Sequence, residues 1–155
     1  MPLEYAATHD WPYHVSCGAV IYRKEGTENL IALLYRGPSF ADPESWHLPA
    51  GTLHYDETLQ EGAMREVAEE SGLEVKLGRY LGALHRSFVD APSGRHMDKT
   101  THYFLATVQD EVGKAGQDGE HDEVQWVPFQ IAKEKLAAGF KREDEVVERA
   151  SSLLI

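Results

Sequence analysis

Apolar residues occur along the chain in short runs that polar, glycine-containing segments separate. Runs of strand length that contain β-branched or aromatic residues predict β-strands. Lys24–Asn29 has turn chemistry around Gly26, so the strands on either side of it should form a hairpin. The predicted strands are His14–Arg23, Leu30–Tyr35, Trp46–Leu48, Glu74–Val89, Lys99–Val108 and Glu123–Val127, the fourth with glycines that predict a bend or bulge.

A helical pattern is strongest between Thr58 and Gly72. Thr58 followed by Glu61 fits a capping box, and Gly72 fits the glycine that ends a helix. An apolar stripe along this helix consists of Ala63, Met64, Val67 and Ala68. Two further helices are predicted at Pro128–Ala138 and Arg142–Leu154, and loops at Arg36–Ser45, Asp90–Asp98 and Gln109–His121. Strands with a few dispersed helices predict an α+β fold, arranged as an α/β/α sandwich.

Composition limits the classes of protein to consider. With 155 residues, 42% of them hydrophobic and 26% charged, the chain can build one full core. We therefore expect a single domain over residues 1–155 with an N-terminal arm at 1–13. No apolar run approaches the roughly 18 residues of a membrane span, and the first residues lack a signal-peptide pattern. We expect a cytoplasmic location and no membrane partner, with a monomer and a homodimer both open.

The net charge and the cysteine content limit the classes of binding partner and of metal site to consider. The net charge of −11 disfavours binding to a long nucleic acid, which depends on cationic side chains. It tolerates a small phosphorylated substrate if bound metal ions supply the positive field. Cys17 is the only cysteine, which excludes an internal disulfide and a thiolate metal cluster.

Three carboxylates lie on one face of the predicted central helix. Glu66, Glu69 and Glu70 are spaced i, i+3 and i+4, and residues at these spacings are neighbours on a helix. Their charges repel one another, so a stable helix needs a reason to keep them together. Because hard divalent cations prefer carboxylate oxygens, the pattern predicts a site for Mg²⁺.

The same segment resembles the signature of a known family. Gly51 is followed after five residues by Glu57, and after seven more by the run Arg65–Leu73, REVAEESGL. This spacing is similar at every fixed position to the Nudix box, GX5EX7REUXEEXGU, of the MutT-like Nudix hydrolases. The resemblance implies the Nudix fold, a mixed β-sheet between helices. It also implies hydrolysis of a nucleoside diphosphate derivative by water attack on phosphorus, with Mg²⁺ or Mn²⁺ bound.

The resemblance assigns roles within the box. Glu69 and Glu70 match metal ligands, and Glu66 matches a ligand or the residue that takes the proton of the attacking water. The backbone carbonyl of Ala50 matches a further ligand, and Arg65 belongs to the catalytic set. Glu57 and Arg65 match positions that brace the loop against the helix by an ion pair, and Gly51 and Gly72 match structural glycines. Some members carry another ligand or the general base on a later loop, where Glu120 is the candidate here, with Asp122 and Glu123 as neighbours.

Cations outside the box are candidates for binding phosphate. Arg86 lies on the strand after the box, and Lys99 and His102 lie on the next strand. If the two strands pair, these residues could line one rim of the site. Arginine has the shape to bind phosphate, and lysine acts as a point charge. Surface charge on a hairpin is the alternative for each of them.

Several alternatives remain open. The substrate could be a nucleoside triphosphate, a dinucleoside polyphosphate or a nucleotide sugar, because the markers of narrower subfamilies are absent. A non-catalytic nucleotide-binding sensor with the same fold has no need of the metal carboxylates, so their presence favours the hydrolase. An isopentenyl-diphosphate-isomerase-like enzyme would need a catalytic cysteine, and Cys17 lies in a predicted core strand, where a small buried residue is the plainer interpretation.

Overall fold

The computed structural model describes residues 4–8, 11–111, 123–139 and 141–154. Its strands are β1 Tyr13–Glu25, β2 Glu28–Arg36, β3 Ser45–His47, β4 Ala50–Thr52, β5 Leu73–Val89, β6 His96–Glu111 and β7 Glu123–Pro128. Its helices are α1 Leu59–Ser71, α2 Phe129–Ala137 and α3 Asp144–Arg149, followed by a 3₁₀ turn, Ser151–Leu153. None of the helices described is long and apolar enough to cross a membrane.

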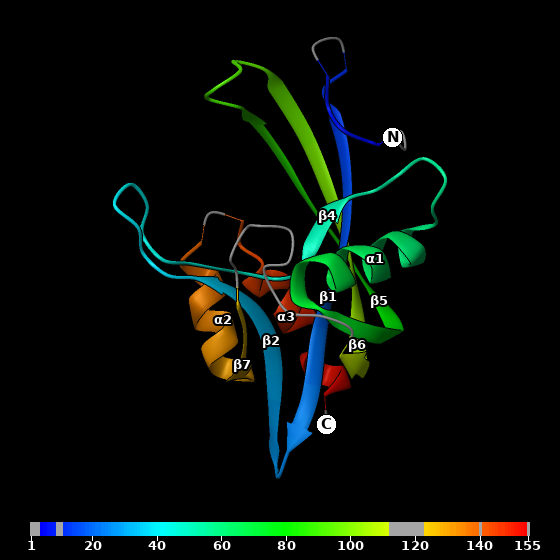
Figure 1. The fold of residues 1–155 in the computed structure, drawn as a ribbon, viewed down its shortest axis with the longest axis vertical. Coiled ribbons are helices and arrows are strands. Elements are labelled where there is room, and N and C mark those ends of the chain that lie inside the picture. The colour runs from blue at the N-terminus through cyan, green and yellow to red at the C-terminus, as the bar shows by residue number, and fades with distance from the viewer. Residues whose placement is uncertain (1–3, 9–10, 112–122, 140, 155) are drawn as a thin grey trace.

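The described strands form one mixed sheet (Figure 1). Its main path runs β3-β2-β1-β6-β5, with β4 paired to β1 and β7 paired to β2. β1 and β6 are parallel, whereas the other pairs are antiparallel. β1 and β2 form the predicted hairpin, and β5 carries register shifts and a left-handed Gly82 at the predicted bend.

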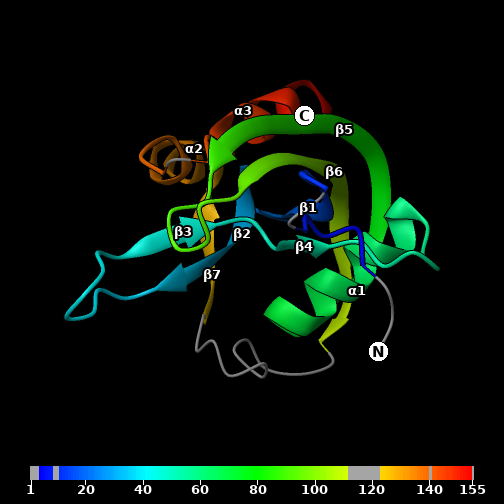
Figure 2. The ribbon, with the colours of Figure 1, turned by 90° about the horizontal axis from the view of Figure 1, so that it is seen from above.

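Helices cover both faces of the sheet, so the predicted sandwich is confirmed. Figure 2 shows α1 on one face and α2 with α3 on the other. Along β1 the side chains alternate between the two cores, as the pleat of a strand requires. Ala19 and Ile21 pack in a cluster with Val67 of α1, whereas Val20 packs in a cluster with Leu136 of α2 and Val147 of α3.

The C-terminal helix is shorter than predicted. Arg142 has φ of 54°, a left-handed conformation that cannot continue into a right-handed helix, so α3 starts at Asp144 rather than Arg142. It ends at Arg149, and Ser151 follows in a 3₁₀ turn. The prediction of one helix over Arg142–Leu154 was therefore wrong at both ends.

The predicted strands differ from the observed ones by a few residues at their ends, most of all in β6, and one observed strand, β4, was not predicted. β6 begins at His96, inside the predicted loop, because Asp98 pairs with Ser87 and His96 with Val89 of β5. β4 was not predicted, since it is only three residues long and follows Pro49. It exists because its backbone pairs with β1, where Gly51 lies opposite Cys17.

The capping box of α1 is confirmed and gives a stability prediction. The Thr58 hydroxyl accepts from the Glu61 backbone N–H at 3.1 Å, and the Glu61 carboxylate accepts from the Thr58 N–H at 3.0 Å. Replacing Thr58 by Ala removes one of these bonds and should lower the free energy of unfolding by about 1 kcal/mol in a urea titration. Thr27→Ala, in the exposed β1–β2 turn, is the matched control and should change it little. Equal effects of the two substitutions would contradict a capping role.

Candidate functional site

The site begins where α1 packs against β4. The Glu66 carboxylate lies directly over Gly51, so that a Cβ built on Gly51 would come within 2.1 Å of Glu66 Oε2. Only glycine can occupy this position without moving the carboxylate. The side chain of Glu66 is 12% exposed, so the contact places a nearly buried acid beside the backbone of β4.

Arg65 connects the loop of the box to the helix. Its guanidinium donates to both Glu57 carboxylate oxygens, at 2.5 and 2.9 Å, and to the Thr52 carbonyl at 2.9 Å. Its Nη1 also donates to Glu66 Oε1 at 2.8 Å and lies 3.2 Å from Glu69 Oε2. One cation thus holds three carboxylates and one carbonyl, which fixes the loop on α1.

The pKa values of the two half-buried acids that Arg65 contacts, Glu57 and Glu66, shift in opposite directions. The hydrogen bonds from Arg65 lower the pKa of Glu57. Burial raises the pKa of Glu66, because the loss of solvation outweighs the hydrogen bond from Arg65. Glu69 adds to this rise by repulsion. Burial therefore disfavours the ionised form of Glu66, and a bound cation would favour it.

The side chains of Glu66, Glu69 and Glu70 do not converge on a common point. Glu69 is 55% exposed and contacts Arg65, whereas Glu70 is 19% exposed and lies 4.0 Å from His47 Nε2. Across the described ranges, no three His, Cys, Asp or Glu side chains are placed to hold a metal ion together. The donors nevertheless fit a hard divalent cation in kind, because carboxylate and carbonyl oxygens are the ligands such cations prefer.

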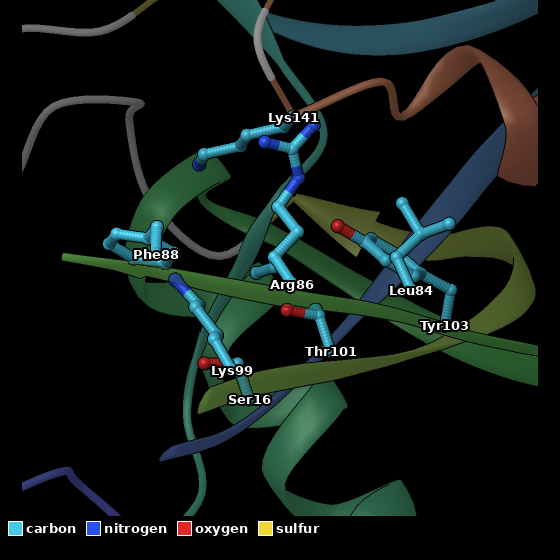
Figure 3. A pocket seen from close by; sticks show the side chains of 9 residues that line it. Ser16, Leu84, Arg86, Phe88, Lys99, Thr101, Tyr103 and Lys141 are labelled. Carbon is cyan, nitrogen blue, oxygen red and sulfur yellow. The ribbon is translucent and has the colours of Figure 1, made fainter. Parts of the chain in front are cut away.

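A small pocket lies on the other side of β4. Because successive strand residues point to opposite faces, Ala50 lines this pocket while Gly51 faces Glu66. The pocket has a volume of about 150 Å³. Figure 3 shows the side chains that line it. Among the residues that line it are Arg86 of β5, Lys99, Thr101 and Tyr103 of β6, and Lys141, which precedes α3.

The predicted phosphate-binding residues divide between the two faces of the sheet. Arg86 and Lys99 are cross-strand partners, and both line the pocket. Burial, together with repulsion by Lys141, lowers the pKa of Lys99. His102 lies at an odd spacing from Lys99 and points away, where its Nδ1 is 2.7 Å from the Tyr80 hydroxyl. The structure therefore does not bring His102 to Arg86 and Lys99.

The other candidates are placed as follows. Glu120 and Asp122 lie outside the described residues. Cys17 is fully buried, and burial raises its pKa to about 12, which weighs against a catalytic thiol and hence against an isomerase. Lys141 was missed in the sequence, because only the tertiary fold brings the segment before α3 to β6.

Comparison with known proteins places this arrangement in a family. Residues 12–150 match the family model described as the NUDIX domain. MutT4 of Mycobacterium tuberculosis is 34% identical over 113 residues, which are 69% of this chain and 44% of that protein. The RNA pyrophosphohydrolase of Erythrobacter litoralis is 30% identical over 148 residues, 86% of this chain and 87% of that protein. The chain spans about half the length of several curated relatives that it matches, MutT4 among them.

Solved structures agree in fold. The MutT protein from Methanosarcina mazei Go1 is 27% identical, with a TM-score of 0.62 over 92% of this chain and 95% of that one. A binary complex of a C. elegans Ap4A hydrolase superposes with a TM-score of 0.67 over 91% of this chain and 97% of that one, at 21% identity. Since the family model spans α1, the glycine beneath Glu66 and all the strands that the structure describes, the chain belongs to the Nudix family.

Proposed function

We propose that this protein is a Mg²⁺-dependent pyrophosphohydrolase, which cleaves a diphosphate linkage in a nucleoside diphosphate derivative by water attack on phosphorus. The observation that carries the proposal is the position of β4. One side of this strand carries the buried Glu66 carboxylate at Gly51, and the other side, at Ala50, lines a pocket with Arg86 and Lys99. An acidic group for a cation, from α1, and cationic groups for phosphate, from β5 and β6, thus lie on either side of one short strand.

Each residue has a role in this proposal. Glu66, Glu69, Glu70 and the Ala50 carbonyl would hold the cation, which Mn²⁺ could replace. When bound, the cation offsets charge on the phosphoryl oxygens and lowers the pKa of a bound water. As an alternative to its role as a ligand, Glu66 would take the proton of that water. Arg86 and Lys99 would hold the phosphates in position.

Arg65 and Glu57 support this arrangement without contacting the substrate. Their ion pair fixes the loop Thr52–Glu57 against α1, which keeps Gly51 beside Glu66. Arg65 also contacts Glu69, so this carboxylate has to exchange a cationic partner for the metal. Arg65 therefore acts as a positioning residue, which holds the loop of the box and Glu66 in place during catalysis.

A non-catalytic nucleotide sensor is the alternative function. Such a protein would use the cation-lined pocket but would have no need of carboxylates that can hold a cation. Arg65 already pairs with Glu66, so the solvation cost of that acid does not separate the two functions; the additional presence of Glu69 and Glu70 favours the hydrolase.

A hydrolysis panel tests the proposal. Phosphate release would be measured with Mg²⁺ and with Mn²⁺ on nucleoside triphosphates, dinucleoside polyphosphates, nucleotide sugars, ADP-ribose and coenzyme A. We expect turnover of at least one compound that EDTA abolishes and added Mg²⁺ restores. Activity that persists in EDTA would contradict the metal requirement. Nucleotide binding without hydrolysis of any compound in the panel would favour the sensor.

A further inference from the structure

The pocket beside Ala50 collects positive charge from separate parts of the chain. Arg86 comes from β5, Lys99 from β6, and Lys141 from the segment that precedes α3 (Figure 3). None of the described residues that line the pocket is acidic. Lys99 and Lys141 are close enough for their repulsion to lower the pKa of Lys99. Glu143 and Glu70, which do not line the pocket, offset part of this repulsion, and an anion bound among the three cations would offset more of it.

The size of the pocket limits what can enter it. Its volume of about 150 Å³ is below the roughly 300–1,000 Å³ of pockets that enclose a whole small molecule. It therefore accepts one compact group rather than a nucleoside. A phosphate at the end of a chain is compact, carries more negative charge than an internal one, and has no second sugar attached on its far side.

Lys141 is held at the pocket by its neighbour Glu143. The Glu143 carboxylate is 2% exposed; it accepts from the Leu48 backbone N–H at 3.1 Å and from the Tyr103 hydroxyl at 2.5 Å. Tyr103 itself lines the pocket, and Leu48 precedes Ala50 by two residues. One buried acid thus ties the segment of Lys141 both to the wall of the pocket and to the turn before β4.

The backbone conformation of Arg142 also indicates that the segment from Lys141 to Glu143 is held in place. Arg142 adopts φ of 54°, which is unfavourable for a residue with a Cβ and persists only where the surroundings impose it. This conformation lets Glu143 enter the core while Lys141 lines the pocket.

We infer that Lys141, positioned by Glu143, completes with Arg86 and Lys99 a subsite for a terminal phosphate group of the substrate. The inference rests on the proposed function and narrows it. It selects substrates whose phosphate chain ends in a free phosphate, such as nucleoside triphosphates, over diphosphates that carry a sugar at both ends.

The test is a binding measurement that does not depend on turnover. Inorganic pyrophosphate would be titrated into the full chain by calorimetry at low salt with EDTA, and ADP-ribose would serve as the diphosphate esterified at both ends. We expect wild-type protein to bind pyrophosphate more tightly than ADP-ribose. Lys141→Gln should weaken pyrophosphate binding about tenfold, as expected for one phosphate contact of about 1.4 kcal/mol.

Lys76→Gln is the matched control, because Lys76 is an exposed lysine of β5 outside the pocket and should leave the affinity unchanged. Wild-type affinity in Lys141→Gln, or no binding by wild-type protein, would overturn the subsite. Tighter binding of ADP-ribose would overturn its preference for a free end. Pyrophosphate binding that depends on Lys141, in a protein that hydrolyses nothing in the panel, would leave the subsite standing and remove the proposed hydrolase.

The positioning role of Glu143 has its own readout. Glu143→Gln removes the anchor of the Lys141 segment and also a negative charge that acts on Lys99 and Lys141. We expect the loss of the anchor to dominate, so pyrophosphate binding should weaken as in Lys141→Gln, and the double variant should bind no more weakly than Lys141→Gln alone. Urea titrations of all variants establish that each one is folded. Loss of stability in Glu143→Gln with unchanged affinity would show that the buried acid serves only the fold.

Discussion

Replacing Glu70 by Gln should lower kcat about thousandfold and leave the protein folded. The substitution keeps the shape of the side chain and removes the charge that a divalent cation requires. A metal clamp contributes several kcal/mol to the transition state, and about 1.4 kcal/mol corresponds to each factor of ten in rate. The side chain of Glu70 is 19% exposed and lies near His47, so its loss leaves the apolar clusters intact. Steady-state turnover of the best compound in the panel, with a thermal melt alongside, measures both effects.

Glu74→Gln is the control for this result. It makes the same change of charge at an exposed acid just past the end of α1, and it should retain turnover. Glu69→Gln should behave like Glu70→Gln. If Glu69→Gln or Glu70→Gln kept near-normal turnover, the substituted residue would not be a metal ligand.

Replacing Arg65 by Met should lower the free energy of unfolding by about 3 kcal/mol. Its guanidinium is 22% exposed and pairs with Glu57 and Glu66, which are 13% and 12% exposed. Removing one partner of a largely buried ion pair leaves the other charge without compensation, which typically costs about 3–5 kcal/mol. We take the lower value because all three groups keep some solvent contact. Urea titration with an unchanged m-value gives the difference.

Arg79→Met provides the comparison for Arg65→Met. Arg79 is an exposed arginine of β5, and its loss should change stability by at most about 0.5 kcal/mol. If the two variants were equally stable, the network around Arg65 would not brace the loop of the box.

Local signals in the sequence predicted the centre of the fold. The bounds of α1 follow from Thr58, Glu61 and Gly72, because caps act within a few residues of the backbone groups that they satisfy. The hairpin of β1 and β2 follows from the turn chemistry around Gly26. By contrast, β4 depends on pairing with a distant strand, and the start of α3 depends on the left-handed Arg142. Neither contact has a local signal.

The candidate phosphate-binding residues also depend on contacts between distant segments, which the sequence does not fully specify. Arg86 and Lys99 are brought together by a hairpin register that the sequence suggests but does not fix. The separation of Lys99 from His102 was accessible from the sequence, because residues three apart on a strand face opposite sides. The contribution of Lys141 was not, since it depends on the burial of Glu143 against Leu48 and Tyr103.

Direct titration with Mn²⁺, followed by the electron paramagnetic resonance of the free ion, tests the central claim that the carboxylates of α1 bind a divalent cation. We predict saturable binding to wild-type protein, competition by Mg²⁺, and affinity at least about tenfold weaker in Glu70→Gln, with Glu74→Gln unchanged. Equal affinity in the wild type and Glu70→Gln, or no binding to wild-type protein, would contradict the account.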